Sequence, residues 1–317
     1  MEHFIFVNGV WSPADAQAQI AADAVQWLDF TQDENQWFVT VENLFGLQVH
    51  ENHIADSLNR QHPPKFEASK DYELLIMPSL IEATDEALEF SAYTMLFNET
   101  LLITIRPPQC LQHAGIVDRL ERRKGKAPNS ITGLLLGILN TLVDAQMNTR
   151  ARFATKVEGW QESLVENENR LDDWQAFFFV QRRFNHLIGL CEMQWDALEE
   201  WRSETDMSLT AHQQIRLTDV LEHLQRLSNH IKQLRSDIDN LLQIYFSLTQ
   251  EKTNEIVRLL TVISVVFLPL NLMAGIFGMN FSSTPLINSG FGFWITLFSM
   301  TAIAIGIIAV LRRLRWL

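Results

Sequence analysis

Leu259 to Leu311 decide the fold: they read LLTVISVVFLPLNLMAGIFGMNFSSTPLINSGFGFWITLFSMTAIAIGIIAVL, without one Asp, Glu, Lys, Arg or His. A single membrane span needs only about 20 apolar residues. As one helix, the stretch would extend roughly 80 Å at 1.5 Å per residue, far beyond a hydrocarbon core of about 30 Å. We therefore expect the stretch to fold back on itself within the membrane.

The turn-forming residues of this stretch gather in one place, at Ser282 to Pro285 and Asn288 to Gly290. Clusters of Ser, Asn, Pro and Gly of this kind mark loops between regular elements. The sequence therefore predicts a membrane hairpin of two helices, at about 259–279 and 291–311, joined by a short uncharged loop.

Positive residues flank both outer ends of this hairpin. Lys252 and Arg258 precede the first helix, and Arg312, Arg313 and Arg315 follow the second. Because Lys and Arg accumulate next to membrane helices on the cytoplasmic side, we expect both termini in the cytoplasm. The predicted location is the cell membrane, the inner membrane where there are two.

The first membrane helix carries a stripe of polar and small residues. Its polar members recur at spacings of seven, three and seven residues: Asn254, Thr261, Ser264 and Asn271. These spacings keep them within roughly 100° of one another around a helix. The stripe also contains Val257, Leu268 and Gly275.

Two interpretations of this stripe stay open. Small and hydroxyl residues are common where membrane helices pack together, so the stripe could be a packing face. A buried Asn in a bilayer also needs polar partners, and water in a pore provides them. One hairpin cannot enclose a pore, so the second interpretation requires an oligomer.

The first helix ends in Gly278-Met279-Asn280, after an apolar run that contains Pro269. Together with Thr253-Asn254-Glu255 upstream and the basic C-terminus, this resembles the CorA family of divalent-cation channels, whose signature is Gly-Met-Asn at this point. The resemblance covers 217–317 well and the rest loosely. It implies a homo-oligomeric, pentameric funnel in which Gly278, Met279 and Asn280 form the selectivity filter and the stripe lines the pore.

The loop after Asn280 leaves the transported ion open. Family members that carry magnesium usually have an acidic residue a few positions further on, but Phe281 to Phe293 contains no carboxylate. The uncharged loop and its Gly-Phe-x-Phe end resemble the ZntB branch, which is associated with zinc. The Gly-Met-Asn form, through Met279, resembles the magnesium branch and favours Mg²⁺ slightly.

Composition and motifs argue against several classes of function. The net charge of −13 argues against nucleic-acid binding. Cys110 and Cys191 are the two cysteines, too few for a disulfide framework or a thiolate cage. We find no Gly-x-x-x-x-Gly-Lys-Ser/Thr motif for a nucleotide and no catalytic constellation. We therefore expect neither an enzyme nor a catalytic cofactor.

Residues 1–150 are predicted to form an α+β cytoplasmic domain, a mixed sheet with helices. Strands are expected at His3 to Val7, Val25 to Phe30, Tyr72 to Pro78, Leu88 to Leu96 and Thr100 to Ile105. Apolar and β-branched runs of this length are typical of strands. Helices are expected at Val49 to Arg60 and, over the sheet, at Leu134 to Asp144. His50 and His53 have helical spacing for a metal, but ordinary surface histidines are far commoner.

Residues 151–258 are predicted to be helical and to end in a long stalk helix, and 259–317 form the hairpin. From Leu217 to Leu248, apolar residues recur at alternating threes and fours, as in a coiled coil. No helix breaker separates this pattern from the membrane run. We therefore expect one continuous helix of at least about 60 residues, roughly 90 Å long.

Asp219 lies near the start of this stalk. When the chain is aligned without gaps on the Gly-Met-Asn signature, Asp219 falls where CorA proteins carry an acidic residue of a regulatory magnesium site between subunits. The family resemblance therefore implies that Asp219 belongs to such a site. A solvated, helix-capping Asp is the alternative. His223 and His230 lie one heptad apart. In an oligomer they could form a zinc-binding ring, and ordinary flanking positions on the helix are the alternative.

These observations predict a channel that passes a divalent cation inward. Mg²⁺ is the first choice, and Zn²⁺ transport, with or without proton coupling, is the alternative. A non-transporting membrane scaffold or sensor is the rival from another class, favoured by the missing loop carboxylate. The expected partners are further copies of the chain, the lipid bilayer and divalent cations.

Overall fold

The computed structural model describes residues 1–7, 10–13, 24–83, 88–122, 128–166, 174–279 and 290–316. The chain divides into two compact units, Met1–Asp239 and Asn240–Leu317. One helix passes through the boundary between them.

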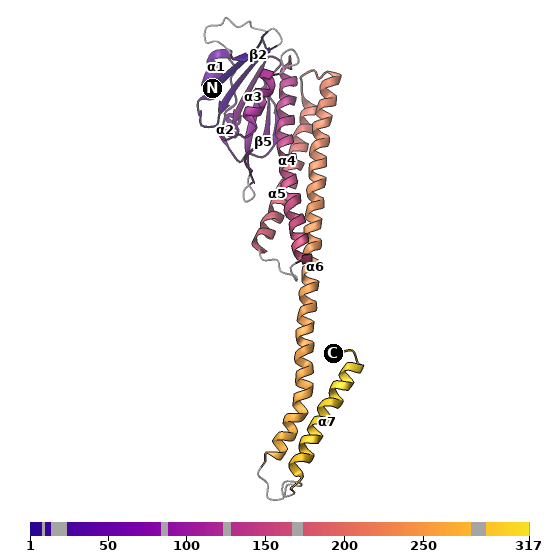
Figure 1. The fold of residues 1–317 in the computed structure, drawn as a ribbon. Helices are drawn as coiled ribbons and strands as arrows, with labels where there is room; N and C mark the ends of the chain where they lie inside the picture. Colours follow the sequence, from indigo (N-terminus) through magenta and orange to yellow (C-terminus); the bar gives the residue numbers. More distant parts are fainter. Residues whose placement is uncertain are drawn as a thin grey trace. The chain divides into compact units, whose positions relative to one another are not determined.

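Among the described residues, seven strands form one sheet in the first unit (Figure 1). They are β1 (Glu2–Val7), β2 (Val10–Pro13), β3 (Gln26–Thr31), β4 (Lys65–Ala68), β5 (Glu73–Ala83), β6 (Leu88–Phe97) and β7 (Leu101–Arg106). The spatial order is β2-β1-β3-β7-β6-β5-β4. Strands β3 and β7 are parallel, and the other neighbours are antiparallel. The predicted mixed sheet is confirmed, and β2 and β4 are additional strands whose ranges were not predicted.

Helices cover both faces of the sheet (Figure 1). One face packs against α3 (His113–Arg122), α4 (Ile131–Glu166), α5 (Trp174–Glu204) and the first part of α6 (Ala211–Phe277). The opposite face packs against α1 (Trp37–Phe45) and α2 (Glu51–Leu58). The predicted core helix is confirmed, because Leu135, Ile138 and Leu142 of α4 are buried against Leu75 and Met77 of β5.

The long stalk helix is also confirmed, since α6 runs without interruption for 67 residues. Its start is fixed by a reciprocal cap: Thr210 Oγ1 accepts from the Gln213 backbone N–H at 3.3 Å, and Gln213 Oε1 accepts from the Thr210 N–H at 2.8 Å. Two orphan donors are thereby satisfied. Leucines of the predicted heptad pattern, among them Leu217, Leu224 and Leu227, are buried in the first unit.

The second unit consists of the rest of α6 and α7 (Gly292–Arg313). Both helices are long and apolar enough to cross a membrane. Their ends at Phe277 and Gly292 agree with the predicted hairpin to within two residues. Figure 1 shows α7 alongside the last turns of α6.

Candidate functional site

The seven residues of the predicted pore stripe all lie on α6, within the second unit. Asn254, Ser264, Asn271 and Gly275 are exposed, and Thr261 is half-buried. The two apolar members are exposed as well, Val257 to 55% and Leu268 to 69%. The described part of the chain therefore leaves most of this stripe uncovered.

A different face of α6 is shielded in the second unit. Within the membrane run, its buried or half-buried residues include Val262, Val266, Leu270, Met273 and Phe277. At about 100° per residue, this set points to the side of α6 opposite the polar stripe. It is wholly apolar, as expected for packing against a neighbouring helix of a hairpin.

The shielded residues of α7 also share one face of their helix. They are Gly292, Thr296, Ser299, Met300, Ala304, Ile307 and Leu311. Small and hydroxyl residues predominate, which allows close approach of membrane helices. The small-residue packing face of the hairpin is thus supplied by α7, and the polar stripe of α6 is not used to pack the two helices of one chain together.

Hydroxyl groups of the stripe bond to their own helix. Thr261 Oγ1 donates to the Val257 carbonyl and Ser264 Oγ to the Leu260 carbonyl, each at 2.8 Å. Asn254 Oδ1 accepts from Gln250 Nε2 at 3.2 Å. These bonds satisfy the hydroxyls without another chain. Asn271, by contrast, holds an exposed amide in a segment apolar enough to span a membrane, where such a group needs water or another polar partner.

The predicted selectivity filter begins directly after the last residue of α6. Gly278 N–H donates to the Ala274 carbonyl at 2.9 Å, and Met279 N–H donates to the Ile276 carbonyl at 3.3 Å. A Cβ on Gly278 would lie 3.1 Å from the Ala274 oxygen, so the close approach at this turn favours glycine. Asn280 and the predicted loop through Ser289 lie outside the described residues.

Asp219 lies in the third turn of α6, because the helix begins at Ala211. The helix-capping interpretation of Asp219 is therefore wrong. Its Oδ1 lies 3.6 Å from His223 Nε2, one turn further along. His223 Nδ1 lies 3.9 Å from Asp144 Oδ1 on α4. All three side chains are partly exposed. The i, i+4 spacing of Asp219 and His223 was visible in the sequence, whereas Asp144 is brought in by the packing of α4.

Comparisons with known proteins agree with these features. Residues 22–313 match the family described as CorA-like Mg²⁺ transporter protein. The chain belongs to this family. It is 22% identical over 282 residues to the cobalt/magnesium transport protein CorA of Thermotoga maritima, covering 87% of this chain and 79% of that protein.

Solved structures in the CorA family share its fold. The complete CorA magnesium transporter of Methanocaldococcus jannaschii matches with a TM-score of 0.86 at 19% identity, over 100% of this chain and 98% of that one. The cytoplasmic domain of ZntB from Vibrio parahaemolyticus matches with a TM-score of 0.60 at 17% identity, over 79% of this chain and 98% of that one. These likenesses confirm the predicted α+β domain, stalk and two membrane helices.

Membership of the CorA family establishes the general function. The protein is a divalent-metal transporter of a membrane, and its family is one of transporters and not of enzymes. The predicted family and the prediction of a non-enzyme are therefore confirmed.

The histidines of α2 do not form the metal pair that their spacing allowed. His50 Nδ1 accepts from the Asn52 N–H at 3.2 Å and caps the helix. His53 is buried, with Nδ1 2.7 Å from the Tyr72 hydroxyl and Nε2 3.2 Å from Glu67 Oε1. The His50 ring thus caps α2, and the His53 ring joins α2 to Tyr72 and Glu67.

Proposed function

We propose that this CorA-family protein is a homo-oligomeric, pentameric channel that passes hydrated Mg²⁺ into the cell. Its pore is lined by Asn254, Val257, Thr261, Ser264, Leu268, Asn271 and Gly275. Gly278, Met279 and Asn280 form the selectivity filter at the outer end. The channel lies in the cytoplasmic membrane with both termini inside the cell.

The observation that carries this proposal is the orientation of the polar stripe. The stripe lies opposite the apolar face of α6 that is shielded in the second unit, and it is exposed along most of its length. Five copies of α6 that turn this stripe toward a common axis would give Asn254 and Asn271 the polar surroundings they need. The same arrangement would leave α7 on the outside, facing lipid.

A ring of Asn280 amides suits the chemistry of Mg²⁺. The ion gives up its water reluctantly, so neutral oxygens that hydrogen-bond to the hydration shell can select the hydrated ion without stripping it. Carboxylates would hold the ion more firmly and slow its release, whereas conduction requires weak binding. The uncharged loop after Asn280 is compatible with this mode of selection.

Leu268 and Val257 provide apolar rings between the polar ones. Apolar constrictions of this kind gate pores by dewetting. Entry needs no nucleotide, because a doubly charged ion gains about 4.6 kcal/mol per 100 mV, twice the value of about 2.3 kcal/mol for a single charge. The continuous helix α6 gives a direct mechanical connection between the cytoplasmic unit and these constrictions.

Asp219 is our candidate for a regulatory Mg²⁺ site on the stalk. A Mg²⁺ ion bound there prefers oxygen ligands, which Asp219 and Asp144 offer on either side of His223. A second subunit would complete the site. Binding of the transported ion at the stalk would then report its cytoplasmic concentration to the pore.

The names of the relatives favour Mg²⁺ or Co²⁺ over Zn²⁺, since the Thermotoga and Methanocaldococcus proteins are both named for cobalt and magnesium. Zn²⁺ transport remains the second candidate because the loop lacks a carboxylate. Purified protein in vesicles, loaded with fluorescent indicators, separates the two. Faster Mg²⁺ than Zn²⁺ influx that is insensitive to an imposed pH gradient supports the first, and zinc flux that rises with the gradient supports the second.

The decisive test of transport is Asn280→Ala. We expect this variant to lose divalent uptake in the same vesicles, whereas Asn288→Ala, which removes an amide from the same loop, should keep it. Normal uptake by Asn280→Ala would refute the filter. Absence of flux in the unmodified protein under every gradient would instead favour the scaffold or sensor.

A matched pair on α6 tests the stripe itself. Asn271→Leu places an apolar side chain on the stripe, and Met273→Leu makes a conservative change on the shielded face. We expect the first to reduce Mg²⁺ influx at least about tenfold and the second to leave it unchanged. Equal influx in both variants would mean that position 271 does not face the ion.

A further inference from the structure

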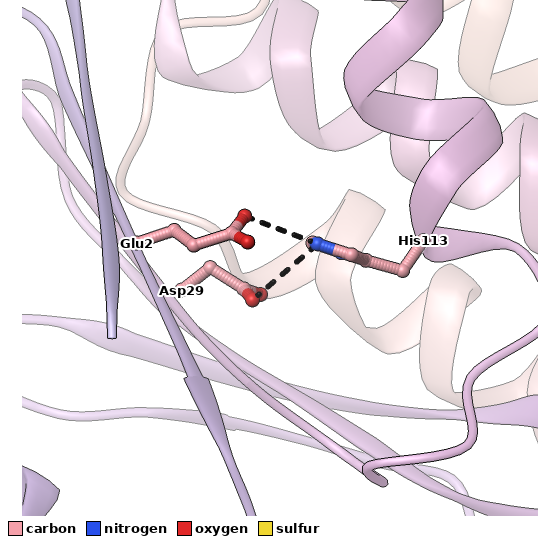
Figure 2. Close-up of side chains that lie close together, drawn as sticks. All are labelled: Glu2, Asp29 and His113. Carbon is pink, nitrogen blue, oxygen red and sulfur yellow. Dashed lines mark hydrogen bonds and ion pairs between the residues drawn. The ribbon is translucent and has the colours of Figure 1, made fainter. Parts of the chain in front are cut away.

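Three potential metal ligands converge in the first unit, at positions that share no motif in the sequence. Glu2 comes from β1, Asp29 from β3 and His113 from the start of α3 (Figure 2). His113 Nε2 lies 3.2 Å from Glu2 Oε2 and 3.8 Å from Asp29 Oδ2. One oxygen or nitrogen of each residue lies within 4.8 Å of the other two.

The sheet register brings the two carboxylates together. Glu2 and Asp29 are directly opposite each other on antiparallel neighbours, so their side chains leave the same face of the sheet. His113 reaches this face because the segment before α3 is anchored on β5. There the Leu80 N–H donates to Gln112 Oε1 at 3.1 Å, and the Leu111 N–H donates to the Leu80 carbonyl at 3.1 Å.

The two neighbouring carboxylates of Glu2 and Asp29 favour the binding of a cation between them. Like charges directly opposite on two strands are destabilising, and Asp29 is only 1% exposed. Arg106 Nε donates to Asp29 Oδ2 at 2.8 Å and balances one carboxylate. Burial raises the pKa of Asp29, and the charges of His113 and Arg106 oppose that rise. Among the described residues of the cluster, Glu2 has no Lys or Arg beside it, and its partner is the His113 imidazole at 3.2 Å.

The ligand set and spacing fit a transition metal. Ligands at about 2.0–2.2 Å from a tetrahedral ion stand about 3.3 Å apart, close to the 3.2 and 3.8 Å found here. Glu2 is half exposed, so its side chain can adjust and water can complete the coordination. Asp29 is held by Arg106 and by the Thr104 hydroxyl, outer partners that orient a metal-binding carboxylate.

We propose that Glu2, Asp29 and His113 bind a divalent transition-metal ion, Zn²⁺ or Co²⁺, at a site independent of the ion pathway. Imidazole nitrogen with carboxylate oxygen suits these ions, whereas Mg²⁺ prefers an all-oxygen shell. The bound ion joins β1, β3 and α3. It therefore stabilises the folded cytoplasmic unit by an amount that rises with the logarithm of its free concentration above the dissociation constant.

The competing arrangement has no metal. His113 Nδ1 is buried and has no hydrogen-bond partner among the described residues. An imidazole with its proton on Nε2, donating to Glu2, would suit that environment. The two arrangements differ in whether Zn²⁺ stabilises the protein, which is measurable without any transport assay.

The experiment uses the full-length protein in detergent, freed of metal and titrated with Zn²⁺ or Co²⁺. Bound metal per chain, the visible spectrum of Co²⁺ and the thermal midpoint are measured for the unmodified protein, Glu2→Gln and His113→Gln. The control is His62→Gln, which alters another histidine–carboxylate pair, His62 with Asp56. Glu2 lies at the exposed edge of the cluster, so its variant is expected to fold.

We expect Glu2→Gln and His113→Gln each to lose one metal equivalent per chain or to need at least about tenfold more Zn²⁺ for the same thermal shift. His62→Gln should behave as the unmodified protein. Equal stoichiometry and equal Zn²⁺ dependence of the thermal midpoint in the unmodified protein and both cluster variants would overturn the site and leave His113 as a hydrogen-bonded histidine.

Discussion

The two parts of α6 use the same kinds of residue for opposite purposes. In the first unit, Leu224 is fully buried among helices and sheet, with 0% exposure, whereas Leu260 in the second unit is 63% exposed. Leu224 belongs to the heptad pattern of the stalk and Leu260 to the apolar membrane run, and both lie on one uninterrupted helix. Apolar character alone therefore does not say what a helix face contacts.

The difference shows which of the two units covers its own apolar and polar side chains. The first unit has its own core, and buried donors such as Trp201 Nε1 and Gln32 Nε2 find acceptors inside it. The second unit shields only one face of each helix and leaves the polar stripe uncovered. Lipid and further copies of the chain would supply what the second unit lacks, as proposed above.

The largest effect on folding is expected at Glu73, which is buried at the start of β5. Its carboxylate accepts from Trp201 Nε1 at 3.2 Å, from Thr205 Oγ1 at 2.8 Å and from the Asp206 N–H at 2.9 Å. Glu73→Ala leaves these donors unsatisfied and should lower the free energy of unfolding by about 3–5 kcal/mol.

Chemical denaturation of the purified protein, followed by circular dichroism, measures this loss. Glu82→Ala is the matched control, since Glu82 is exposed at the other end of the same strand. Its effect should stay within about 0.5 kcal/mol. Similar losses in both variants would mean that the first unit does not depend on its buried polar network.

The comparison within α6 is tested directly by Leu224→Ala and Leu260→Ala. The first creates a cavity in the core and should cost about 2–5 kcal/mol. The second removes an exposed side chain and should cost under about 0.5 kcal/mol. Thermal unfolding in detergent compares the two. A comparable loss for Leu260→Ala in the oligomer would show that a neighbouring copy covers this leucine.

The sequence predicted elements with a strong local signal. The charge-free run, the heptad leucines and the five apolar strands each carry their own periodicity, so the membrane helices, the stalk and most of the sheet were predictable. The helix α1 was missed, because Trp37, Val39 and Val41 favour strands and no side chain caps its start. Burial of Trp37 and its Nε1 bond to Ser57 Oγ at 3.2 Å hold this helix in place, and neither is visible locally.

The two candidate sites also differ in whether a local sequence pattern predicts them. Helical spacing in the sequence is enough to predict the polar stripe on α6. The shielded face on the opposite side of α6 becomes visible once the positions of α6 and α7 are known. The cluster of Glu2, Asp29 and His113 depends on the pairing of β1 with β3 and on the position of α3. These residues are far apart in the sequence and share no motif, so only the folded chain brings them together.

A smaller effect on stability is expected from two glycine substitutions, which distinguish the cost of backbone conformation from the cost of steric contacts. Gly46 ends α1 with φ of +66°, and a Cβ there would meet nothing within 4 Å. Gly46→Ala should therefore cost about 1 kcal/mol from the left-handed backbone alone. Gly306 lies inside α7, also with open space around a Cβ, and Gly306→Ala should be neutral or slightly stabilising. Thermal midpoints of the two variants should thus move differently, and equal shifts would refute the conformational explanation.

The smallest effect concerns pH and an ion pair of the first unit, Lys65 with Glu67. Lys65 Nζ lies 2.6 Å from Glu67 Oε2. This hydrogen bond lowers the pKa of Glu67 below its usual 4.5, and the bond from His53 adds to the effect against the opposing effect of burial. The ionised form is therefore favoured by folding.

The stabilisation from Glu67 should be complete above about pH 4.5, the pKa in the unfolded chain, and should disappear as the pH falls through the lower pKa of the folded state. Both side chains are partly exposed, so solvent screening limits the gain to about 0.2–1 kcal/mol. Glu67→Gln should lower the free energy of unfolding by this amount at pH 7, and the difference from the unmodified protein should vanish toward pH 3. A difference that stays constant between pH 7 and pH 3 would mean that Glu67 contributes by packing and not by charge, because packing of an uncharged side chain does not titrate.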